Sequence, residues 1–246
     1  MVSSSAVANK FYDPGDQRAA KVNDLFAAIA PRYDLINDLQ SAGLHRLWKR
    51  RLLRLANGRP GEHALDLCCG TGDVAFALAR RGVDTVGLDF SEPMLAVAGQ
   101  RLKSAAHPLP VRFLRGDAQQ IPFPDASFDI VTISYGLRNL ADWQTGLREM
   151  LRVARPGGRL LVLDFGKPDN ALWRSLYFAY LRRLVPLMGR WFCGDADTHG
   201  YILESLLHYP AQRGVAAKME ELQLTGVRVI NLMGGIMSIN LGVKKP

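Results

Sequence analysis

The chain has 246 residues, with 31 Lys and Arg against 23 Asp and Glu, which gives a formal net charge of +8. Apolar residues make up 48% and charged residues 22%, a balance that excludes a disordered chain. Three cysteines, two of them adjacent, exclude a disulfide framework and favour a reducing compartment. The excess positive charge predicts an anionic partner, which is nucleic acid, a membrane surface or an anionic ligand.

The N-terminal part is predicted to be a mobile tail, residues 1–20, ahead of a single domain that spans residues 21–246. Residues 21–56 carry apolar stripes at helical spacing, which predicts a helical segment. We expect neither a signal peptide nor a membrane span, because no basic leader and no uncharged run of 18 apolar residues occur. The sequence therefore predicts a protein that is soluble or bound to a membrane surface.

From residue 63 the pattern changes to short apolar strands that alternate with helices. Strands are predicted at residues 63–67, 85–88, 111–114, 128–134 and 159–165, with helices at 72–81, 91–103 and 142–154. This alternation predicts a Rossmann-like α/β fold with a mostly parallel sheet and helices on both faces. Residues 169–223 read as a helical insertion or cap, and strand-like runs at 227–232 and 235–243 bring the sheet to seven strands.

Three loops at the carboxyl ends of consecutive predicted strands carry residues suited to a ligand. In chain order they contribute Asp66, Gly70, Thr71, Gly72, Asp89, Asp117 and Ala118. The glycines allow close approach and begin a helix whose N-terminus favours negative charge. Asp89 can accept hydrogen bonds from ribose hydroxyls, while Asp117 and Ala118 suit an adenine amino group and ring. A plain structural turn or helix cap is the alternative for each loop taken alone. Three such loops together favour a ligand, because open α/β sheets bind ligands at the carboxyl ends of their strands.

These loops, with residues 122–129 and the Arg-Pro-Gly-Gly turn at 155–158, resemble those of class I S-adenosylmethionine-dependent methyltransferases. The resemblance implies S-adenosylmethionine as the cofactor and adds Ser134 to its contacts. Cys68 stands where this class usually has its first glycine, and we expect Cys68 and Cys69 to be small buried filler beneath the cofactor.

A narrower resemblance covers nearly the whole chain. It rests on Tyr-Asp-Leu-Ile-Asn at 33–37 with Ser41, His45 and Trp48, on Thr-Ile-Ser-Tyr-Gly-Leu-Arg-Asn at 132–139, and on 163–168, 203–205 and 231–236. These motifs, in this order, are similar to those of the quinone C-methyltransferases of menaquinone and ubiquinone biosynthesis. The chain departs from the family at Asp164, where Glu is common, at Gly166, where Ser is common, and at His199, where Tyr is common.

The N-terminal motif predicts a lid over the substrate. Tyr33, Asn37, Ser41 and His45 are four residues apart and share one face if the helix continues past Gly43. Such a hydrogen-bonding stripe among apolar neighbours suits a quinol ring, whereas a polar surface stripe or an internally satisfied histidine is the alternative. The substrate candidates in the insertion are His199 and Tyr201, with a capping turn as the alternative for His199.

The catalytic candidates follow the fourth predicted strand, on the cofactor's side of the sheet. Methylation of a ring carbon needs an electron-rich ring, and a nearby Arg lowers the pKa of a phenol, which is ordinarily about 10. We expect Arg138 to stabilise the quinolate and Asn139 to orient it, and His45 or Asp34 to accept the proton. An ion pair with Asp142 is the alternative for Arg138.

Basic residues interleave with apolar and aromatic ones at 48–55 and 173–192, which predicts contact with an anionic membrane. Packed helices with a solvated basic face are the alternative. We expect no nucleic-acid partner and no metal, because no RNA-binding module and no histidine ligand spacing is present. The expected location is the cytoplasm, peripherally at the inner face of the membrane, and a homodimer is left open.

The sequence as a whole predicts S-adenosylmethionine-dependent methylation of a polyprenyl hydroquinone, with demethylmenaquinol as the favoured substrate. The benzoquinol of the ubiquinone pathway is the close alternative. An NAD(P)-dependent reductase is disfavoured because no Tyr-x-x-x-Lys pair occurs. A non-catalytic cofactor-binding protein is disfavoured because the cofactor loops and the Gly-Leu-Arg-Asn motif are both retained.

Overall fold

The computed structural model describes residues 18–30, 33–193 and 197–246. Most of the predicted tail therefore lies outside the described residues. Helix α1 begins at Arg18, within the last residues of the segment predicted to be a tail, and the tail itself stays a prediction.

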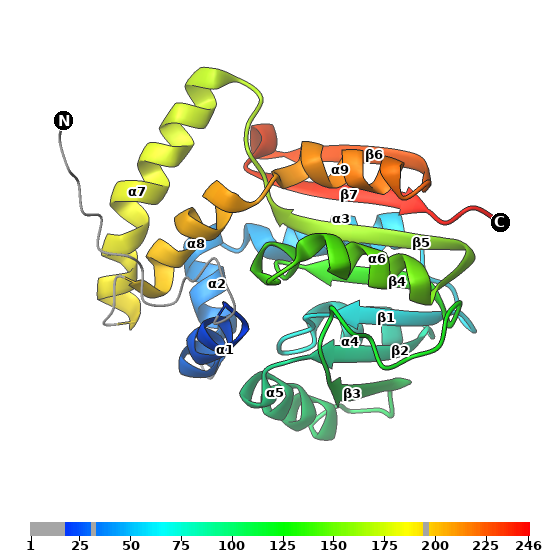
Figure 1. Ribbon diagram of the computed structural model, residues 1–246. Coiled ribbons are helices and arrows are strands. Elements are labelled where there is room, and N and C mark those ends of the chain that lie inside the picture. The colour runs from blue at the N-terminus through cyan, green and yellow to red at the C-terminus, as the bar shows by residue number, and fades with distance from the viewer. Residues whose placement is uncertain (1–17, 31–32, 194–196) are drawn as a thin grey trace.

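A single seven-stranded sheet forms the centre of the molecule (Figure 1). Its strands are β1 (His63–Leu67), β2 (Asp84–Asp89), β3 (Val111–Arg115), β4 (Phe128–Ser134), β5 (Ala154–Phe165), β6 (Thr225–Leu232) and β7 (Met237–Val243). They lie in the order β3-β2-β1-β4-β5-β7-β6, with β1 to β5 parallel and β7 antiparallel between β5 and β6. The predicted mostly parallel, seven-stranded Rossmann-like sheet is confirmed.

Helices cover both faces of the sheet. They are α1 (Arg18–Ile29), α2 (Tyr33–Ser41), α3 (Leu44–Ala56), α4 (Asp73–Ala79), α5 (Glu92–Lys103), α6 (Trp143–Val153), α7 (Ala171–Cys193), α8 (Asp197–His208) and α9 (Ala211–Glu221). Successive side chains of β4 point to opposite faces, as strand geometry requires. Ile130 packs in one core cluster with α3 and α4, and Val131 packs in another with α6 and α9. Burial on both faces explains why the central strands are continuously apolar.

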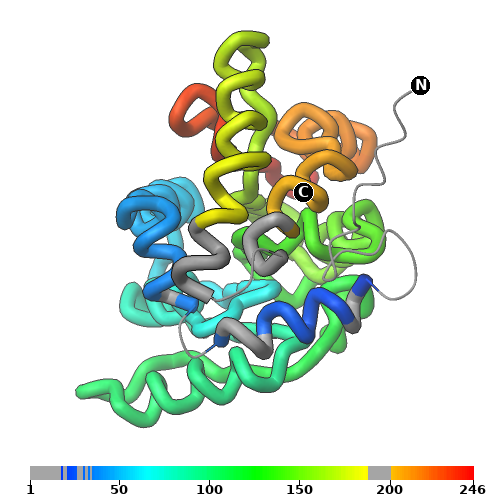
Figure 2. Tube along the Cα trace, turned by 90° about the vertical axis from the view of Figure 1, so that its left-hand side faces the viewer, coloured from blue at the N-terminus to red at the C-terminus, as the bar shows by residue number. Residues whose placement is uncertain are grey.

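A further layer of helices lies over the carboxyl ends of the parallel strands. Figures 1 and 2 show α1, α2, α7 and α8 together at this end of the sheet, although α1 and α8 are far apart in the sequence. The loops predicted to bind a cofactor end at the same edge. The fold therefore encloses the candidate site between the strand ends and a helical cover.

The N-terminal helices do not form one continuous helix. Ala42 and Gly43 adopt left-handed backbone conformations, with φ of 47° and 74°, and separate α2 from α3. The condition set for a single stripe from Tyr33 to His45, that the helix continues past Gly43, is therefore not met, because the glycine has no Cβ to oppose a positive φ.

Candidate active site

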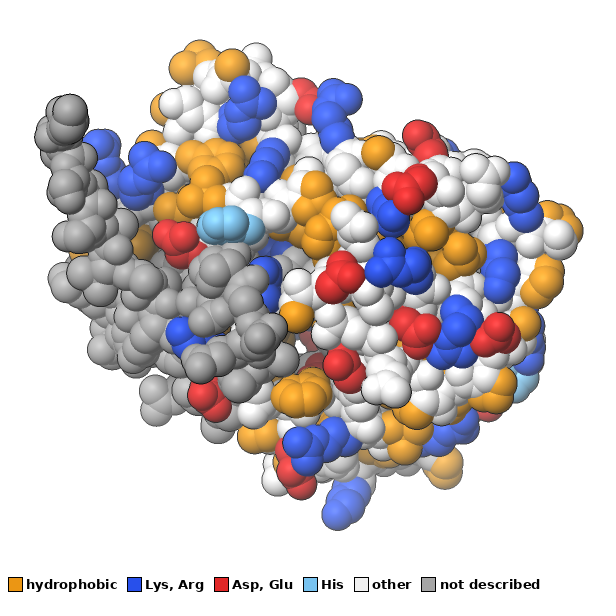
Figure 3. Space-filling model, in the orientation of Figure 1, with side chains coloured by type: hydrophobic (Ala, Val, Ile, Leu, Met, Phe, Trp, Pro, Cys, Tyr) orange, Lys and Arg blue, Asp and Glu red, His pale blue; other side chains and the backbone are white. Residues whose placement is uncertain are grey.

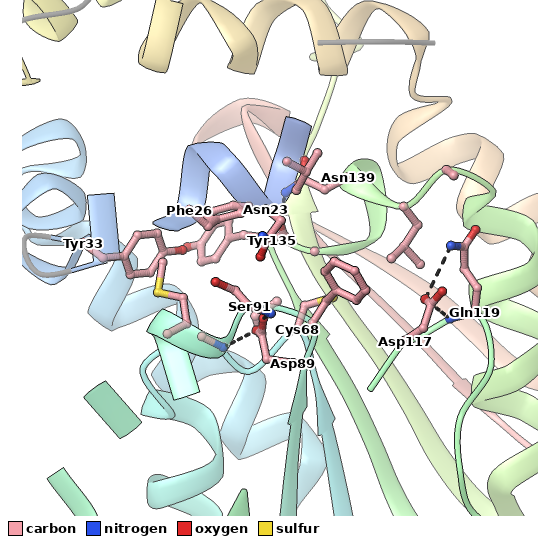
Figure 4. Close-up of a pocket in the computed structure, with 18 residues that line it drawn as sticks. Asn23, Phe26, Tyr33, Cys68, Asp89, Ser91, Asp117, Gln119, Tyr135 and Asn139 are labelled. Atoms are coloured by element: carbon pink, nitrogen blue, oxygen red, sulfur yellow. Dashed lines mark hydrogen bonds between the residues drawn. The ribbon is translucent and has the colours of Figure 1, made fainter. Parts of the chain in front are cut away.

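The first cavity lies at the carboxyl ends of the strands and under α1 (Figure 4). Its lining includes four of the residues predicted to bind the cofactor, which are Gly70, Asp89, Asp117 and Ser134. From α1 come Val22, Asn23 and Phe26. The cavity thus has a floor of strand-end loops and a roof of helix, and its carboxylates come from two neighbouring strands.

Asp89 shapes the floor of this cavity. Its Oδ2 accepts a hydrogen bond from the N–H of Gly70 at 2.7 Å, and its Oδ1 accepts one from the N–H of Ser91 at 2.8 Å (Figure 4). Burial raises the pKa of the Asp89 carboxyl, while these backbone hydrogen bonds act in the opposite direction. Ser91 occupies the N-cap position of α5, but its hydroxyl makes no capping hydrogen bond. The Ser91 Oγ is instead a buried polar atom with no hydrogen-bond partner in the described ranges.

The loop that follows β1 lines the first cavity with Cys68 as well as with Gly70. Cys68 has a φ of 49° in the left-handed region, where glycine is favoured, and it lines the cavity. A Cβ on Gly136 would lie 2.5 Å from the Cβ of Cys68, so the close approach of these two loops requires a glycine at one of them. Burial raises the pKa of both the Cys68 and Cys69 thiols well above the usual value, which favours the uncharged thiol. This environment suits the predicted filler role.

Four of the predicted cofactor residues stand behind the cavity wall. They are Asp66, Thr71, Gly72 and Ala118, and none of them lines the cavity. Asp66 is 1% exposed and accepts a hydrogen bond from Thr132 Oγ1 at 2.7 Å. Burial raises the pKa of its carboxyl to about 7. These residues support the loop, and direct contact between them and a cofactor stays a prediction.

The second cavity is larger and adjoins the first. It has a volume of about 490 Å³ and lies among α1, α2, α3, α7, α8 and the ends of β5 and β7. Phe26, Tyr33 and Tyr135 line both cavities, which places the boundary between them at these three aromatic side chains. The remaining wall is mostly apolar, so this cavity suits a hydrophobic ligand.

The structure brings together six of the predicted substrate and catalytic residues around this second cavity. They are Tyr33, Asn37, Ser41, His45, Arg138 and Tyr201. Asn139 lines the first cavity, where its Oδ1 accepts a hydrogen bond from the Tyr201 hydroxyl at 2.9 Å. The side chains of Asp34 and His199 lie outside the described residues.

Arg138 is held by a buried carboxylate. Its Nη1 donates to Asp164 Oδ1 at 2.9 Å and to the Tyr135 carbonyl at 2.6 Å, and its guanidinium lies 4.6 Å from the centre of the Phe165 ring. Burial lowers the pKa of Arg138, but Asp164 outweighs it, so the net shift is upward and the guanidinium stays charged. The Nε of Arg138 is buried and has no hydrogen-bond partner within the part of the chain that the structure describes.

The alternative in which Arg138 pairs with Asp142 is wrong. Asp142 is the N-cap of α6, where it accepts a hydrogen bond from the N–H of Gln144, and its carboxylate pairs with Arg148. Asp164, at the end of β5, takes the role because β5 lies beside β4 in the sheet, which is a tertiary neighbour and not a sequence neighbour.

His45 is also oriented by an acid. Its Nε2 lies 2.8 Å from Asp38 Oδ1, and Arg46 binds both oxygens of the same carboxylate. Hydrogen bonds from Arg46 and His45 lower the pKa of Asp38 to about 2, so the carboxylate is ionised and acts only as an acceptor. Because the ionised Asp38 can only accept, Nε2 of His45 donates to it, and the buried Nδ1 has no hydrogen-bond partner among the described residues.

Tyr135 organises the loop that follows β4, and the sequence analysis did not single it out as a site residue. Its φ is 61°, a strained value for a residue with a side chain. Its carbonyl accepts hydrogen bonds from Arg138 Nη1 and from Asn139 Nδ2, the latter at 3.0 Å, while its N–H donates to the Leu163 carbonyl at 2.7 Å. The position directly after β4 and before Gly136 was the available signal.

Other missed residues have weaker signals or none. Asp38 lies one helical turn before the break between α2 and α3, and nothing in its local sequence indicates a role. Asp164 was noted only as a departure from the family. Trp173, Tyr177 and Tyr180 of α7 belong to the segment predicted to contact a membrane, and no signal in the sequence indicated that all three also line the second cavity.

The sheet order with its antiparallel β7, together with a cofactor-type cavity at the strand ends, defines a class I methyltransferase. Solved structures share the fold: a SAM-dependent methyltransferase from Thermotoga maritima matches with a TM-score of 0.65 at 17% identity, over 90% of this chain and 99% of that one. One from Aquifex aeolicus matches with a TM-score of 0.58 at 17% identity, over 94% and 98%.

Sequence comparison gives the family. Residues 15–244 match the ubiE/COQ5 methyltransferase family, so the chain belongs to it. A ubiquinone/menaquinone biosynthesis C-methyltransferase of Ectopseudomonas mendocina (strain ymp) is 42% identical over 238 residues, which cover 94% of this chain and 91% of the relative. The predicted family and S-adenosylmethionine dependence are confirmed by this membership.

Proposed function

We propose that the chain transfers a methyl group from S-adenosylmethionine to a ring carbon of demethylmenaquinol, which gives menaquinol. The supporting observation is the set of polar atoms in the apolar second cavity. Arg138 Nε, His45 Nδ1 and the hydroxyls of Tyr135 and Tyr177 are buried without hydrogen-bond partners among the described residues, and all four residues line this cavity. Buried polar groups are almost always paired, so such a set fits a flat ligand that carries oxygen atoms.

The first cavity fits the methyl donor. Asp89, held by the Gly70 and Ser91 amides, suits the ribose hydroxyls, and Asp117 suits the adenine. The unpartnered hydroxyls of Ser91 and Ser134 are further donors for the cofactor. When bound, the cofactor supplies an electrophilic methyl group on a sulfonium centre. The protein's part is to hold the acceptor carbon near that group at the boundary between the cavities.

Arg138 and His45 prepare the acceptor ring. A phenol ordinarily has a pKa of about 10, so the hydroquinone must lose a proton to become a strong carbon nucleophile near neutral pH. His45 Nδ1 is the acceptor for that proton, because Asp38 fixes the proton of the ring on Nε2. Arg138 donates through Nε to the resulting oxygen, while Asp164 balances part of its charge.

The remaining atoms also balance. The ring carbon would gain the methyl group as the bond from methyl to sulfur breaks. The hydrogen on that carbon would then leave as a proton to solvent, which restores the aromatic ring, and His45 would return its proton to the quinolate oxygen. Asn139, held by Tyr201 and by the Tyr135 carbonyl, orients the acceptor from the cofactor side. Asp34, His199, Ser41 and Asn37 stay predicted contacts.

The number of aromatic side chains in the wall of the second cavity supports a naphthoquinol substrate over a benzoquinol one. Trp48, Tyr135, Phe165 and Tyr177 line the cavity and suit stacking against a fused bicyclic ring. We place the reaction at the cytoplasmic face of the membrane because a polyprenyl quinol resides in the bilayer. Among the described residues, no helix is long and apolar enough to cross a membrane.

Quinone profiling tests this assignment. The gene is expressed in a host that lacks its own enzyme, and the quinones are measured by mass spectrometry. We expect demethylmenaquinone to be converted to menaquinone, and purified protein to methylate demethylmenaquinol faster than 2-methoxy-6-polyprenyl-1,4-benzoquinol. Growth rescue without that conversion, or calorimetry that detects binding of NADH but not of S-adenosylmethionine, would contradict the proposal.

A further inference from the structure

Helix α7 exposes an unusual amount of apolar surface. Leu172, Leu176, Tyr180 and Leu184 recur every fourth residue and are 71%, 55%, 37% and 53% exposed. This spacing places them on one side of the helix, and we call them the α7 stripe. Solvent-exposed patches of this kind mark interaction sites, because water-facing leucines in a row are unfavourable.

The α7 stripe is continuous with the second cavity. Leu176 and Tyr180 belong to both, and the cavity follows α7 from Trp173 to Val185, which is about 18 Å of helix. Trp173, also at the cavity, is 39% exposed and donates from its indole N–H to the Met233 carbonyl at 3.1 Å. A hydrocarbon tail that starts in the cavity therefore leaves it along the α7 stripe.

The charge beside the α7 stripe is positive. α7 carries four arginines and no acidic residue, and among them Arg174, Arg182 and Arg183 are exposed. Figure 3 shows hydrophobic and basic side chains next to one another over α7. Helix α3, which also lines the cavity, carries no acidic residue and exposes four arginines, Arg46, Arg50, Arg51 and Arg54.

We infer that the α7 stripe docks in the plane of an anionic phospholipid bilayer, so that the prenyl chain of the substrate passes directly from lipid into the second cavity. This inference rests on the proposed function for the identity of the tail. Leucines with flanking arginines and interfacial aromatic side chains match the way an amphipathic helix lies at a lipid surface. The alternative occupant is a second copy of the chain, which the net charge of +8 disfavours, since two like-charged surfaces would meet.

Vesicle binding tests the docking surface without any substrate. The full chain is mixed with phosphatidylcholine vesicles that contain 0% or about 30% phosphatidylglycerol. The test variant is Leu172→Asp/Leu184→Asp, since neither leucine lines a cavity. The control is Leu114→Asp/Val229→Asp, which makes the same charge change at positions 37% and 39% exposed on β3 and β6.

We expect wild-type binding to require phosphatidylglycerol and to weaken in high salt. We expect the test variant to lose at least tenfold of its partition onto anionic vesicles, while the control stays within twofold of wild type. Equal binding by the test variant, or binding indifferent to lipid charge and salt, would overturn the inference. A change in oligomeric state of the test variant with unchanged vesicle binding would assign the stripe to a second copy, and would also overturn it.

Activity separates this inference from the proposed function. On a short-chain, water-soluble demethylmenaquinol analogue, the test variant should turn over within twofold of wild type, whereas on long-chain substrate in vesicles it should lose at least tenfold. Loss on both substrates would show that the surface belongs to the fold or to catalysis and not to docking. Vesicle binding by a protein that methylates no quinol would refute the proposed function and leave the docking surface standing.

Discussion

The two adjoining cavities are built in different ways. The first takes most of its wall from loops within residues 68–141, each of which follows a strand, and α1 closes it. The second collects side chains from residues 25–48, 135–165, 173–202 and 233–237. Its polar atoms are aligned by partners from other elements, such as Asp164 for Arg138. A cavity made of strand ends follows from local sequence, whereas a cavity made of helix faces depends on how distant segments pack.

The two kinds of wall also suit different ligands. In the first, carboxylates and backbone amides form fixed turns that suit a polar ligand. In the second, a few polar atoms sit without partners in an apolar wall, which suits chemistry on a hydrophobic ring. Variants in the two regions should therefore affect different measured quantities, and four such variants follow from the largest expected effect to the smallest.

Arg138 lines the second cavity, although it follows β4, a strand whose end contributes to the first cavity. Arg138→Leu alone would leave Asp164 as an unpaired buried charge, which costs about 3–5 kcal/mol of stability. The informative variant is Arg138→Leu/Asp164→Asn, compared with Asp164→Asn alone. We expect the double variant to lose at least about 100-fold in kcat, or about 2.7 kcal/mol, because the donor to the quinolate is gone.

The cofactor Kd of the double variant, measured by calorimetry, should stay within threefold of wild type. Equal losses in kcat and in cofactor affinity would indicate a structural role for Arg138. A double variant no slower than Asp164→Asn would remove Arg138 from the mechanism altogether.

Asp38 acts through His45 and should affect the pH profile. In Asp38→Asn the amide can donate to His45 Nε2, which moves the ring proton to Nδ1 and removes the proton acceptor. We expect kcat near neutral pH to fall about thirtyfold, or about 2 kcal/mol. The loss should narrow as the pH approaches about 10, where the substrate phenol ionises without help.

The control for Asp38 is Asp24→Asn, an exposed carboxylate on α1. A loss in Asp38→Asn that is the same at every pH would point to a folding defect in the segment that joins α2 and α3, and not to the tautomer of His45.

Asp66 tests the supporting layer behind the first cavity. Burial raises the pKa of its carboxyl from 3.8 to about 7, so between these values the native state binds more protons than the unfolded state. The free energy of unfolding therefore falls as the pH rises through this range. Asp66→Asn removes this pH dependence, because the amide does not titrate. The free energy of unfolding of wild type minus that of the variant should therefore fall by about 2 kcal/mol from pH 5 to pH 7.

Denaturant unfolding at several pH values measures this difference. The control is Asp73→Asn. Although burial acts in the opposite direction, Lys49 and Arg101 hold the pKa of the Asp73 carboxyl at about 2. The contribution of Asp73 to the free energy of unfolding is therefore constant above pH 5. A pH-independent difference for Asp66→Asn would show that the carboxyl titrates normally in the folded protein.

Asp89→Asn has the smallest expected effect, but it should change the cofactor Kd without changing the quinol KM. Asp89→Asn keeps one acceptor for the backbone but weakens the site for ribose hydroxyls, so the cofactor Kd should rise about tenfold, or about 1.4 kcal/mol. The KM for the quinol should stay within twofold. Asp84→Asn, at the opposite end of β2 and half exposed, is the control. An Asp89→Asn variant that raises quinol KM as much as cofactor Kd would contradict the division into two cavities.

The family departures show where tertiary context decides. At Gly166 a Cβ would lie 2.4 Å from the Gly235 carbonyl and 2.9 Å from Gln212 Oε1, so the serine common in the family does not fit this chain as it is packed. At Asp164 the shorter acid still reaches Arg138 at 2.9 Å. The sequence identified both positions as unusual, but only the packing around β5 gives a reason.

Periodicity and loop chemistry by themselves determined the α/β order, the helical insertion and the Asp89 and Asp117 loops, because each is encoded within one strand, one helix or one turn. The motifs also named Arg138, His45 and Tyr201 correctly as neighbours of one site. Tertiary structure alone decided that Asp164 and Asp38 hold Arg138 and His45, and that α7 is both cavity wall and exposed stripe. These features depend on pairs of residues brought together by sheet order and helix packing, and no local pattern records such pairs.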